Sequence, residues 1–414
     1  MGPHGCASTL TQVSSKPQTA SMTGQHISAE EWTRKGFEAI RAKDLPAALD
    51  AFRAATQGPG ASAEAFLGLA LTELAHRNHD AFGAAIDRAL ALEPQNPKAL
   101  VLKGDGLMHD NNRRAALPFY RAALSNAPAN PPPSLKRDLD RAAAMVASLA
   151  QDLEDFLRAE LEREGFNPST SSPRFALALD LMTGRRERNP GPQQPRMFFL
   201  PGLAEHGFYP RDKLAWLPAL EAATSTLKGE LSNVLSDTGS FAPYVMPETN
   251  APQRDYQGMA GNQDWSAYYL WKNGAEVPAN MAQCPQTTAI LSQMPLCDMP
   301  QRAPMALFSW LKPGARIPPH QGMMNTRLIC HLPLIVPADC GFRVGAETRS
   351  WQEGHAWAFD DTYDHEAWNR SADLRVILIF DVWRPDVTPE ERHLIRSMLA
   401  AIDTYAGVPP RWEI

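Results

Sequence analysis

Small and apolar residues recur every 34 residues between positions 29 and 130 of the chain. Three units begin at Ala29, Ala63 and Pro97. When the units are aligned, five columns stand out: Gly36, Ala70 and Gly104; Ala48, Phe82 and Ala116; Phe52, Ile86 and Tyr120; Ala55, Ala89 and Ala123; Gly60, Pro94 and Pro128. A fixed period of this length predicts a repeat architecture, in which units stack because none can bury its apolar face alone.

The columns resemble the tetratricopeptide repeat, whose unit is a pair of antiparallel helices. Small residues at the eighth and twentieth positions let the two helices approach, and the bulky residue at the twenty-fourth fills the space between units. Proline then ends the second helix. Phe82 departs from the pattern, since Ala is usual there. The resemblance implies an α-solenoid whose concave surface holds a peptide or a partner protein; a spacer or an oligomerisation face is the alternative.

The next segment predicts a helix that caps the repeats, within residues 131–165. Its apolar residues follow helical spacing: Leu139, Ala143, Val146, Leu149, Leu153, Phe156, Leu157 and Leu161. Asn167–Pro173 and Arg185–Pro195 are rich in Pro, Gly, Ser and Gln, which is typical of a linker. We therefore predict a disordered N-terminus at 1–28, repeats with their cap at 29–165, a linker at 166–195 and a second domain at 196–414.

The second half of the chain changes period after about residue 200. A helix is still expected at Leu214–Leu235, but from Met305 onwards the apolar runs are short, β-branched or aromatic. Pro318 and Pro319 are expected at a strand turn. The candidate strands are Met305–Lys312, Arg327–Ile335, Gly341–Val344, His355–Phe359, His365–Asn369 and Arg375–Trp383. Their close spacing predicts a jelly-roll type of sandwich or barrel, so the overall fold class is multidomain α plus β.

Composition supports this division and narrows the function. Nine of the ten Trp residues follow residue 200, so the two halves differ in kind. The formal charge of −6 argues against a nucleic-acid partner. Neither a signal peptide nor an apolar run long enough for a membrane span is visible, so a cytoplasmic location is the default expectation. The five cysteines lack a CxxC pair, and a Cys284–Cys297 disulfide stays open.

Candidate chemistry gathers in the predicted strands. His320 follows a turn, His365 comes 45 residues later, and Arg375 ten residues after that. Arg375 shares a strand face with Ile377 and Ile379, and an Arg on an apolar face is costly unless it meets an anion. This layout is typical of an iron- and 2-oxoglutarate-dependent oxygenase. Neutral imidazoles hold Fe(II), and the Arg binds the far carboxylate of the cosubstrate.

Many ordered motifs between residues 196 and 390 carry a more specific resemblance. They include Phe199–Leu203, Trp265-Ser266, Pro313-Gly314, His320-Gln321-Gly322, Arg327-Leu328, His331-Leu332, Arg343-Val344-Gly345, Phe359-Asp360-Asp361, His365-Glu366 and Asp381-Val382-Trp383. This segment resembles the aspartyl/asparaginyl β-hydroxylase family. The resemblance implies a double-stranded β-helix, or cupin-like jelly roll, with flanking helices.

The resemblance also implies residue roles. His320 and His365 match the iron ligands, and the position that usually supplies a carboxylate ligand is Gly322, as in this family. Asp361 is expected to orient a water molecule in the position left open. The remaining matches are Arg375 and Ser309 for the remote carboxylate of 2-oxoglutarate, His331 and Trp265 for other cosubstrate contacts, and Arg327 for the substrate. Ile329 replaces an Arg of the animal enzymes, which removes a positive charge from the predicted active-site face.

The predicted function is a dioxygenase that uses Fe(II), 2-oxoglutarate and O₂. It would hydroxylate an Asp, Asn or related side chain of a protein or peptide held by the repeats, with succinate and CO₂ as co-products. Ile329 favours the alternative, a small-molecule hydroxylase acting on a free amino acid or a lipid acyl chain. The repeats would then serve assembly or regulation. A non-catalytic scaffold is a third interpretation, opposed by the intact His320, His365, Ser309 and Arg375.

Overall fold

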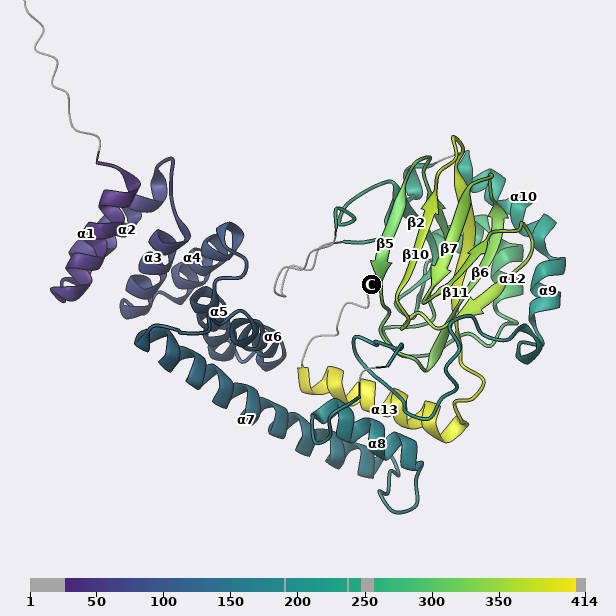
Figure 1. Ribbon diagram of the computed structural model, residues 1–414, viewed down its shortest axis with the longest axis horizontal. Helices are drawn as coiled ribbons and strands as arrows, with labels where there is room; N and C mark the ends of the chain where they lie inside the picture. The colour runs from purple at the N-terminus through teal and green to yellow at the C-terminus, as the bar shows by residue number, and fades with distance from the viewer. Residues whose placement is uncertain (1–26, 190, 237, 247–256, 407–414) are drawn as a thin grey trace, which may run out of the picture. The chain divides into compact units, whose positions relative to one another are not determined.

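The computed structural model of the chain describes residues 27–189, 191–236, 238–246 and 257–406 (Figure 1). By internal contacts the chain divides into two compact units, whose described parts lie within residues 27–92 and 93–406. The disorder predicted for residues 1–28 lies outside the described residues, except that Ser28 caps the first helix. Over the described ranges, no helix is both long and apolar enough to cross a membrane.

The first unit consists of two helix pairs that begin at the predicted repeat starts. Each first helix is capped by a serine: Ser28 accepts a hydrogen bond from the backbone N–H of Glu31 at 3.1 Å, and Ser62 from that of Ala65 at 3.1 Å. A turn of three residues separates the helices of each pair. The helices are α1 (Ala29–Arg41), α2 (Leu45–Gln57), α3 (Ala63–Ala75) and α4 (His79–Leu92).

Phe52 at the twenty-fourth repeat position fills the space between units, as the pattern predicts. Its ring is fully buried and lies between two glycines. A Cβ at Gly36 would come within 2.7 Å of the ring, and one at Gly68 would overlap it. Gly36 lies in the same 34-residue repeat as Phe52, and Gly68 lies in the next repeat. The Phe52 ring of α2 therefore packs against α1 of its own repeat and α3 of the next. This close approach requires glycine at both positions.

The second unit begins with a third helix pair, α5 (Pro97–His109) and α6 (Arg113–Ser125). Here a Cβ at Gly104 would meet the Tyr120 ring at 2.7 Å, which repeats the glycine–aromatic contact of the first unit. The predicted cap is α7 (Pro133–Arg163), which packs on α6 and also on the C-terminal helix α13 (Pro389–Ala406) (Figure 1).

The predicted linker at 166–195 contains a packed helix, α8 (Pro173–Thr183). Its apolar face, with Phe175 and Leu179, is buried against Phe198, Trp383 and residues of α13. The Pro/Gly-rich stretches that suggested a linker are only its flanks. The segment is therefore part of a hydrophobic core of the second unit, and the domain boundaries stay a prediction.

Two antiparallel sheets follow, and with the helices they confirm the α plus β class. Among the described residues, a seven-stranded sheet has the order β1-β2-β4-β11-β6-β9 with β3 paired to β2, and a four-stranded sheet has the order β5-β10-β7-β8. The larger sheet comprises β1 (Ala242–Pro243), β2 (Trp265–Lys272), β3 (Ala275–Glu276), β4 (Ala306–Leu311), β6 (Arg327–Ile335), β9 (Trp357–Phe359) and β11 (Arg375–Trp383). The smaller comprises β5 (Arg316–His320), β7 (Cys340–Val344), β8 (Glu347–Ser350) and β10 (His365–Asn369). That these strands form a double-stranded β-helix stays a prediction.

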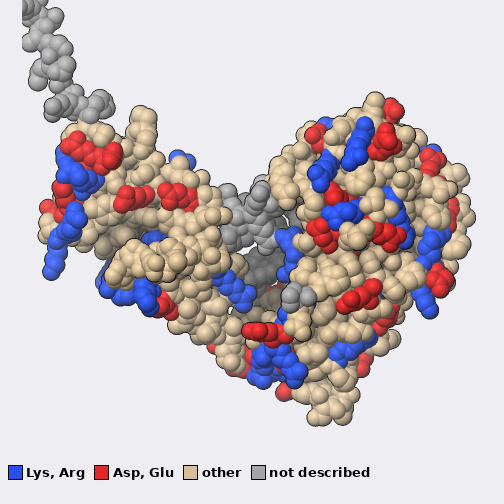
Figure 2. All heavy atoms as spheres, viewed as in Figure 1, with Lys and Arg blue, Asp and Glu red and all other residues tan. Residues whose placement is uncertain are grey.

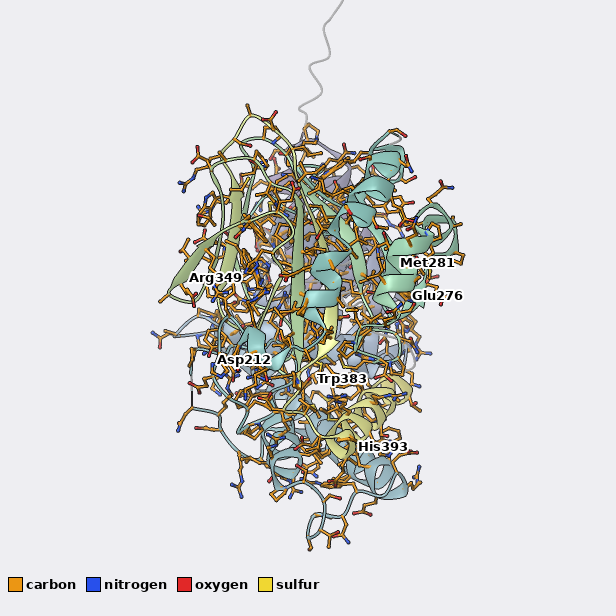
Figure 3. All side chains as sticks on the ribbon, turned by 90° about the vertical axis from the view of Figure 1, so that its right-hand side faces the viewer. Asp212, Glu276, Met281, Arg349, Trp383 and His393 are labelled. Carbon is orange, nitrogen blue, oxygen red and sulfur yellow. The ribbon has the colours of Figure 1, made fainter. Side chains whose placement is uncertain are left out.

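Strand alternation builds a core on each face of the larger sheet. On β11, Leu378 and Phe380 face a cluster shared with helices, whereas Ile377 and Ile379 face a cluster shared with the smaller sheet. The helices that cover the outer face are α9 (Leu217–Ala222), α10 (Thr224–Leu235), α11 (Pro278–Gln283) and α12 (Pro285–Leu291). In Figure 3 helices lie in front of the strands. The inner face, between the two sheets, is where the predicted site residues lie.

Strands β6, β10 and β11 have the predicted bounds, and β5 was missed. Pro318 and Pro319 lie within β5 and not at a turn, so that expectation was wrong. The edge place of β5 explains how it tolerates them, because an edge strand can do without ladder donors. The predicted helix at Leu214–Leu235 is divided into α9 and α10.

Candidate functional site

A pocket opens between the two sheets and encloses about 490 Å³ of empty space, part of it open to solvent. Its walls come mainly from β4, β6 and β11 on one side and β5, β7 and β10 on the other. Seven of the eight predicted site residues line the pocket, namely Trp265, Ser309, His320, His331, Asp361, His365 and Arg375. Arg327 is the one predicted site residue outside this lining.

His320 and His365 lie side by side because they are direct partners in the β5–β10 ladder. Their ring centroids are 4.1 Å apart. Nδ1 of His320 bonds the carbonyl of Pro318 at 2.8 Å, and Nδ1 of His365 bonds the carbonyl of Tyr363 at 2.9 Å. Since a carbonyl only accepts, Nδ1 carries the proton in both rings, and Nε2 keeps the lone pair that a metal needs.

Both imidazoles are neutral at physiological pH. Burial, together with the neighbouring His365, lowers the pKa of His320 to about 3. Burial likewise lowers the pKa of His365 to about 4, and the Arg343 guanidinium contributes. A neutral ring is the form that binds a metal ion.

Asp361 occupies the space above Gly322, where a carboxylate ligand two residues after the first His would otherwise stand. A Cβ at Gly322 would overlap the carboxylate of Asp361. The backbone N–H of Gly322 also donates to the carbonyl of Asp361 at 2.6 Å. Of the two carboxylate oxygens, Oδ1 is buried without a hydrogen-bond partner among the described residues. Asp361 thus brings an available acceptor to the pocket wall beside the two histidines.

Arg327 holds Asp361 from behind. Its Nη2 donates to Asp361 Oδ2 at 2.9 Å and its Nη1 to Asp381 Oδ2 at 2.8 Å. All three side chains are at most 1% exposed. Burial raises the pKa of Asp361 and the Arg327 charge opposes that rise. The substrate contact predicted for Arg327 therefore stays a prediction, and the geometry assigns its guanidinium to two carboxylates.

Arg375 is a buried cation on the pocket wall. It is 1% exposed, and its Nε and Nη1 have no hydrogen-bond partner in the described part of the chain. Its guanidinium lies 5.4 Å from the centroid of the Trp351 ring. Burial lowers the pKa of Arg375 to about 10, so the side chain still carries its charge at neutral pH. A buried Arg with two unused donors is a site prepared for an anion.

Ser309 and Trp265 lie on neighbouring strands of the same wall. Trp265 Nε1 donates to Ser309 Oγ at 3.1 Å, and Ser309 is the register partner of Ile377, two residues after Arg375. His331 also lines the pocket; its Nδ1 is buried with no partner among the residues described, and its ring lies 5.3 Å from that of Trp351. The structure thus collects on one pocket the residues predicted to contact a cosubstrate, and that role stays a prediction.

Part of the aromatic and apolar wall of the pocket was not predicted. It includes Tyr244, whose ring stacks on Trp265 at 4.2 Å and whose hydroxyl donates to the Met305 sulfur at 3.5 Å. Phe342, Trp351 and other apolar residues complete the wall. The Tyr244 segment carries no periodic pattern, so nothing in the sequence placed it here. The Trp excess of the second half was the single available signal for an aromatic wall.

The residues present fit a metal ion with a bidentate carboxylate ligand. Two neutral imidazoles, the unused Asp361 oxygen and the unpaired Arg375 donors all face one cavity. Over the described residues, no cluster of three or more His, Cys, Asp or Glu side chains is placed to hold a metal ion. A metal here would thus depend on the histidine pair and on ligands from outside the protein.

The described cysteines, Cys284, Cys297, Cys330 and Cys340, are all free thiols, so Cys284 and Cys297 do not pair.

Comparison with known proteins supports the resemblance that the motifs indicated. Residues 221–385 match the model of the family described as Aspartyl/Asparaginyl beta-hydroxylase, which confirms the resemblance over this segment. Aspartate beta-hydroxylase domain-containing protein 2 of Xenopus tropicalis is 31% identical over 214 residues, 51% of this chain and 56% of that protein. Ornithine lipid ester-linked acyl 2-hydroxylase of Rhizobium tropici is 31% identical over 177 residues, 42% of this chain and 59% of that protein.

The helical part resembles a solved repeat domain. The Arabidopsis OM64 TPR domain aligns with 28% of this chain and 93% of its own length, at 22% identity and a TM-score of 0.25. The match spans little more than half the length of each of these two curated relatives. The similarity therefore covers the pocket and its sheets, and what the whole protein acts on is a matter for proposal.

Proposed function

We propose that the protein is an Fe(II)- and 2-oxoglutarate-dependent hydroxylase, with His320 and His365 as its protein ligands to iron. The observation that carries the proposal is one pocket that holds two neutral, adjacent imidazoles and a buried, unpaired guanidinium. The first arrangement suits a divalent metal, and the second suits the remote carboxylate of a dicarboxylic cosubstrate. Few other ligand pairs would use both.

Bound Fe(II) would supply the oxygen chemistry, in which R–H, O₂ and 2-oxoglutarate become R–OH, succinate and CO₂. The protein's residues bind, orient and exclude water. Arg375 and Ser309 anchor the carboxylate, and Trp265 fixes the Ser309 hydroxyl by donating to its oxygen at 3.1 Å. Asp361 accepts a hydrogen bond from a water molecule through Oδ1 and so orients it. The aromatic wall keeps bulk water from the reacting centre.

The first candidate substrate is an Asp, Asn or related side chain of a protein or peptide. The family match and the repeats support it, because stacked helix pairs are commonly a surface for peptides. In this proposal the concave side of the repeats recruits the polypeptide, and the pocket hydroxylates one of its side chains. The protein would act in the cytoplasm, where no disulfide is needed and the buried thiols stay reduced.

The second candidate substrate is an uncharged chain, such as a lipid acyl group, or a free amino acid. Ile329 is the observation that favours it: the residue lines the pocket where the animal enzymes carry Arg. Of the described lining residues, Arg375 is the only Arg or Lys. If Arg375 binds the cosubstrate, the described wall offers no second cation to an acidic side chain. The relative from Rhizobium tropici, named for acting on a lipid acyl chain, is in keeping with this candidate.

Substrate-dependent turnover tests the proposal and separates the candidates. The full-length protein, loaded anaerobically with Fe(II), is exposed to O₂ and 2-oxoglutarate with Asp- and Asn-containing peptides, free amino acids or acyl lipids. Succinate is quantified, and the hydroxylated product is located by mass spectrometry. His365→Ala is the control, since it removes one ligand from the pair. Absence of Fe(II) binding, or of 2-oxoglutarate turnover with every substrate class, would contradict the proposal.

A single substitution sharpens the choice between the candidates. Ile329→Arg places a guanidinium in the pocket wall, and Ile329→Met is its matched control of similar length without charge. If acyl chains are the substrate, the Arg variant loses turnover and the Met variant keeps most of it. If an acidic peptide is the substrate, the Arg variant turns it over at least as fast as the wild type.

A further inference from the structure

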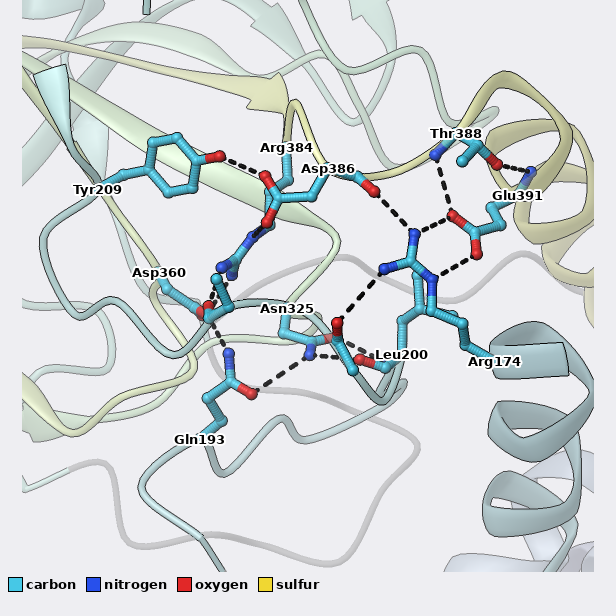
Figure 4. Close-up of polar contacts among 12 residues, drawn as sticks. Arg174, Gln193, Leu200, Tyr209, Asn325, Asp360, Arg384, Asp386, Thr388 and Glu391 are labelled. Atoms are coloured by element: carbon cyan, nitrogen blue, oxygen red, sulfur yellow. Dashed lines mark hydrogen bonds and ion pairs between the residues drawn. The ribbon is translucent and has the colours of Figure 1, made fainter. Parts of the chain in front are cut away.

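A second buried Asp–Arg pair lies directly beside the candidate site. Asp360 precedes Asp361 and is 0% exposed, as is Arg384, which follows the end of β11. Arg384 Nη1 donates to Asp360 Oδ2 at 2.9 Å (Figure 4). Neither side chain lines the pocket, and neither matches a predicted role. Burying an ion pair is costly, so its presence next to the site calls for a reason.

The carboxylate of Asp360 is fully occupied by donors that belong to its surroundings. Oδ2 accepts from Arg384 and from Gln193 Nε2 at 2.6 Å, while Oδ1 accepts from the Thr362 backbone N–H at 3.0 Å and from its hydroxyl at 2.5 Å. The bonds to Thr362 fold residues 360–362 into a tight turn. The bonds to Arg384 and Gln193 tie that turn to the protein interior.

Two consecutive carboxylates are therefore held by two arginines. Asp361 bonds Arg327, at the start of β6, and Asp360 bonds Arg384, just beyond the end of β11. These strand ends are neighbours, since Trp383 is the register partner of Arg327 and the Arg384 N–H donates to the carbonyl of Thr326 at 3.1 Å. The turn from Asp360 to His365 is thus fixed from both sides, at its first two residues.

We propose that Arg384, acting through Asp360, is a positioning residue that fixes the turn carrying Asp361 and His365 and thereby sets the affinity for the metal. The inference rests on the proposed function, because it assigns the turn to a metal centre. The turn ends at His365, one of the two imidazoles, and bears the acceptor Oδ1 of Asp361. Displacing it would move both groups relative to His320, which lies on another strand.

The rest of the polar chain extends away from the site. Arg384 also donates through Nε to Asp386 at 3.3 Å and through Nη2 to the carbonyl of Ala204. The carbonyl of Asp386 accepts from Arg174 of α8, which forms a two-point ion pair with Glu391 of α13 (Figure 4). Among Arg384, Asp386, Arg174 and Glu391, Arg384 is the residue that contacts Asp360, so it is the residue to change.

The test compares Arg384→Lys and Asp360→Asn with Arg302→Lys in the full-length protein. Lysine keeps the charge of Arg384 but loses the fork that reaches three acceptors at once. Arg302 is a matched control because it is equally buried, at 0% exposure, and pairs with Asp403 of α13 at 2.6 and 2.7 Å. Mn(II), a redox-inert probe, is titrated and its bound fraction is followed by electron paramagnetic resonance. Amide hydrogen exchange is followed over residues 360–365, and melting temperatures are recorded for all variants.

We expect the Mn(II) dissociation constant to rise about 10- to 100-fold in Arg384→Lys and Asp360→Asn, the usual effect of removing support from a metal ligand. Exchange over residues 360–365 should speed up in the same two variants. Arg302→Lys should lower the melting temperature comparably and change neither readout. Mn(II) affinities that stay with those of Arg302→Lys, or unchanged exchange over the turn, would overturn the inference. If the wild type binds no Mn(II), the proposed function fails, and the exchange result still decides whether Arg384 fixes the turn.

Discussion

Replacing Arg375 by Met should stabilise the ligand-free protein while it removes the affinity for 2-oxoglutarate. In the proposed function the guanidinium binds the remote carboxylate of the cosubstrate. Without that anion, two of its donors, Nε and Nη1, are buried without a partner among the described residues. Methionine fills a similar volume and has no charge to bury. The two effects of one substitution therefore have opposite signs.

The magnitudes follow from the burial of the side chain. Burial lowers the pKa of Arg375 from 12.5 to about 10. At about 1.4 kcal/mol per unit, folding the charged form costs about 3 kcal/mol. The sign is set by pH: below both pKa values the charged form dominates in folded and unfolded protein, so the full cost is present at pH 7. Arg375→Met should therefore raise the free energy of unfolding by about 1–3 kcal/mol, since some packing is lost.

The loss of cosubstrate affinity is larger. A hydrogen bond to a charged group contributes about 1.5–3 kcal/mol, so two of them contribute about 3–6 kcal/mol. Because about 1.4 kcal/mol corresponds to a factor of ten, the dissociation constant for 2-oxoglutarate should rise about 10²- to 10⁴-fold.

Calorimetry decides both points. The melting temperature is recorded without ligands, and 2-oxoglutarate is titrated into the Mn(II)-loaded protein. The control is Arg302→Met, which removes a buried Arg that is already paired with Asp403. Breaking such a pair costs about 3–5 kcal/mol, so this variant should melt at a lower temperature. The reasoning is refuted if Arg375→Met destabilises the ligand-free protein as much as Arg302→Met does, or binds 2-oxoglutarate like the wild type.

Three further predictions concern packing and charge. Gly68→Ala should lower the free energy of unfolding by about 1–3 kcal/mol, because the new Cβ overlaps the Phe52 ring; chemical denaturation measures this, and an unchanged midpoint would contradict it. Gly322→Ala should weaken Mn(II) binding by displacing the Asp361 carboxylate, with little change in overall fold by circular dichroism; wild-type affinity would count against the contact. Although burial opposes it, hydrogen bonds from a neighbouring guanidinium and hydroxyl hold the pKa of Glu391 at about 2. The stabilisation from its charge is complete above about pH 5 and is lost as pH falls towards 2, so the stability difference between wild type and Glu391→Gln should shrink over that interval. A difference independent of pH would show that the carboxylate is not the cause.

The described surface charges of the second unit do not indicate a ligand or a partner. Acidic and basic side chains are interspersed over the face of the second unit that Figure 2 shows, in line with the modest net charge of −6. The exposed side of the smaller sheet carries paired charges, with Arg343 bonded to both Asp364 and Glu366 at 2.7 and 2.6 Å. The predictions about function and stability therefore rest on the buried charges.

Much of the candidate site could be predicted from two patterns in the sequence, the alternation of apolar residues along strands and the motifs that carry the family resemblance. The bounds of β6, β10 and β11 follow from their alternating apolar residues, and that alternation already placed Arg375 on the face of Ile377 and Ile379. The resemblance then assigned roles to the residues on that face. Strand β5 was missed because two consecutive prolines read as a turn, and only the sheet order shows that they lie at an edge.

The sequence by itself determined the repeat period, the helix starts at Ala29 and Ala63, and the set of polar residues that the pocket collects. The tertiary structure decided which partner each charge has. Arg327 was expected at the substrate, and its guanidinium bonds Asp361 and Asp381, 34 and 54 residues away. Local patterns report which face a side chain takes because the backbone repeats every two or 3.6 residues. They carry no information on which strands become neighbours. The role of a buried charge depends on the partner that a neighbouring strand brings to it, so that role is decided by the tertiary structure.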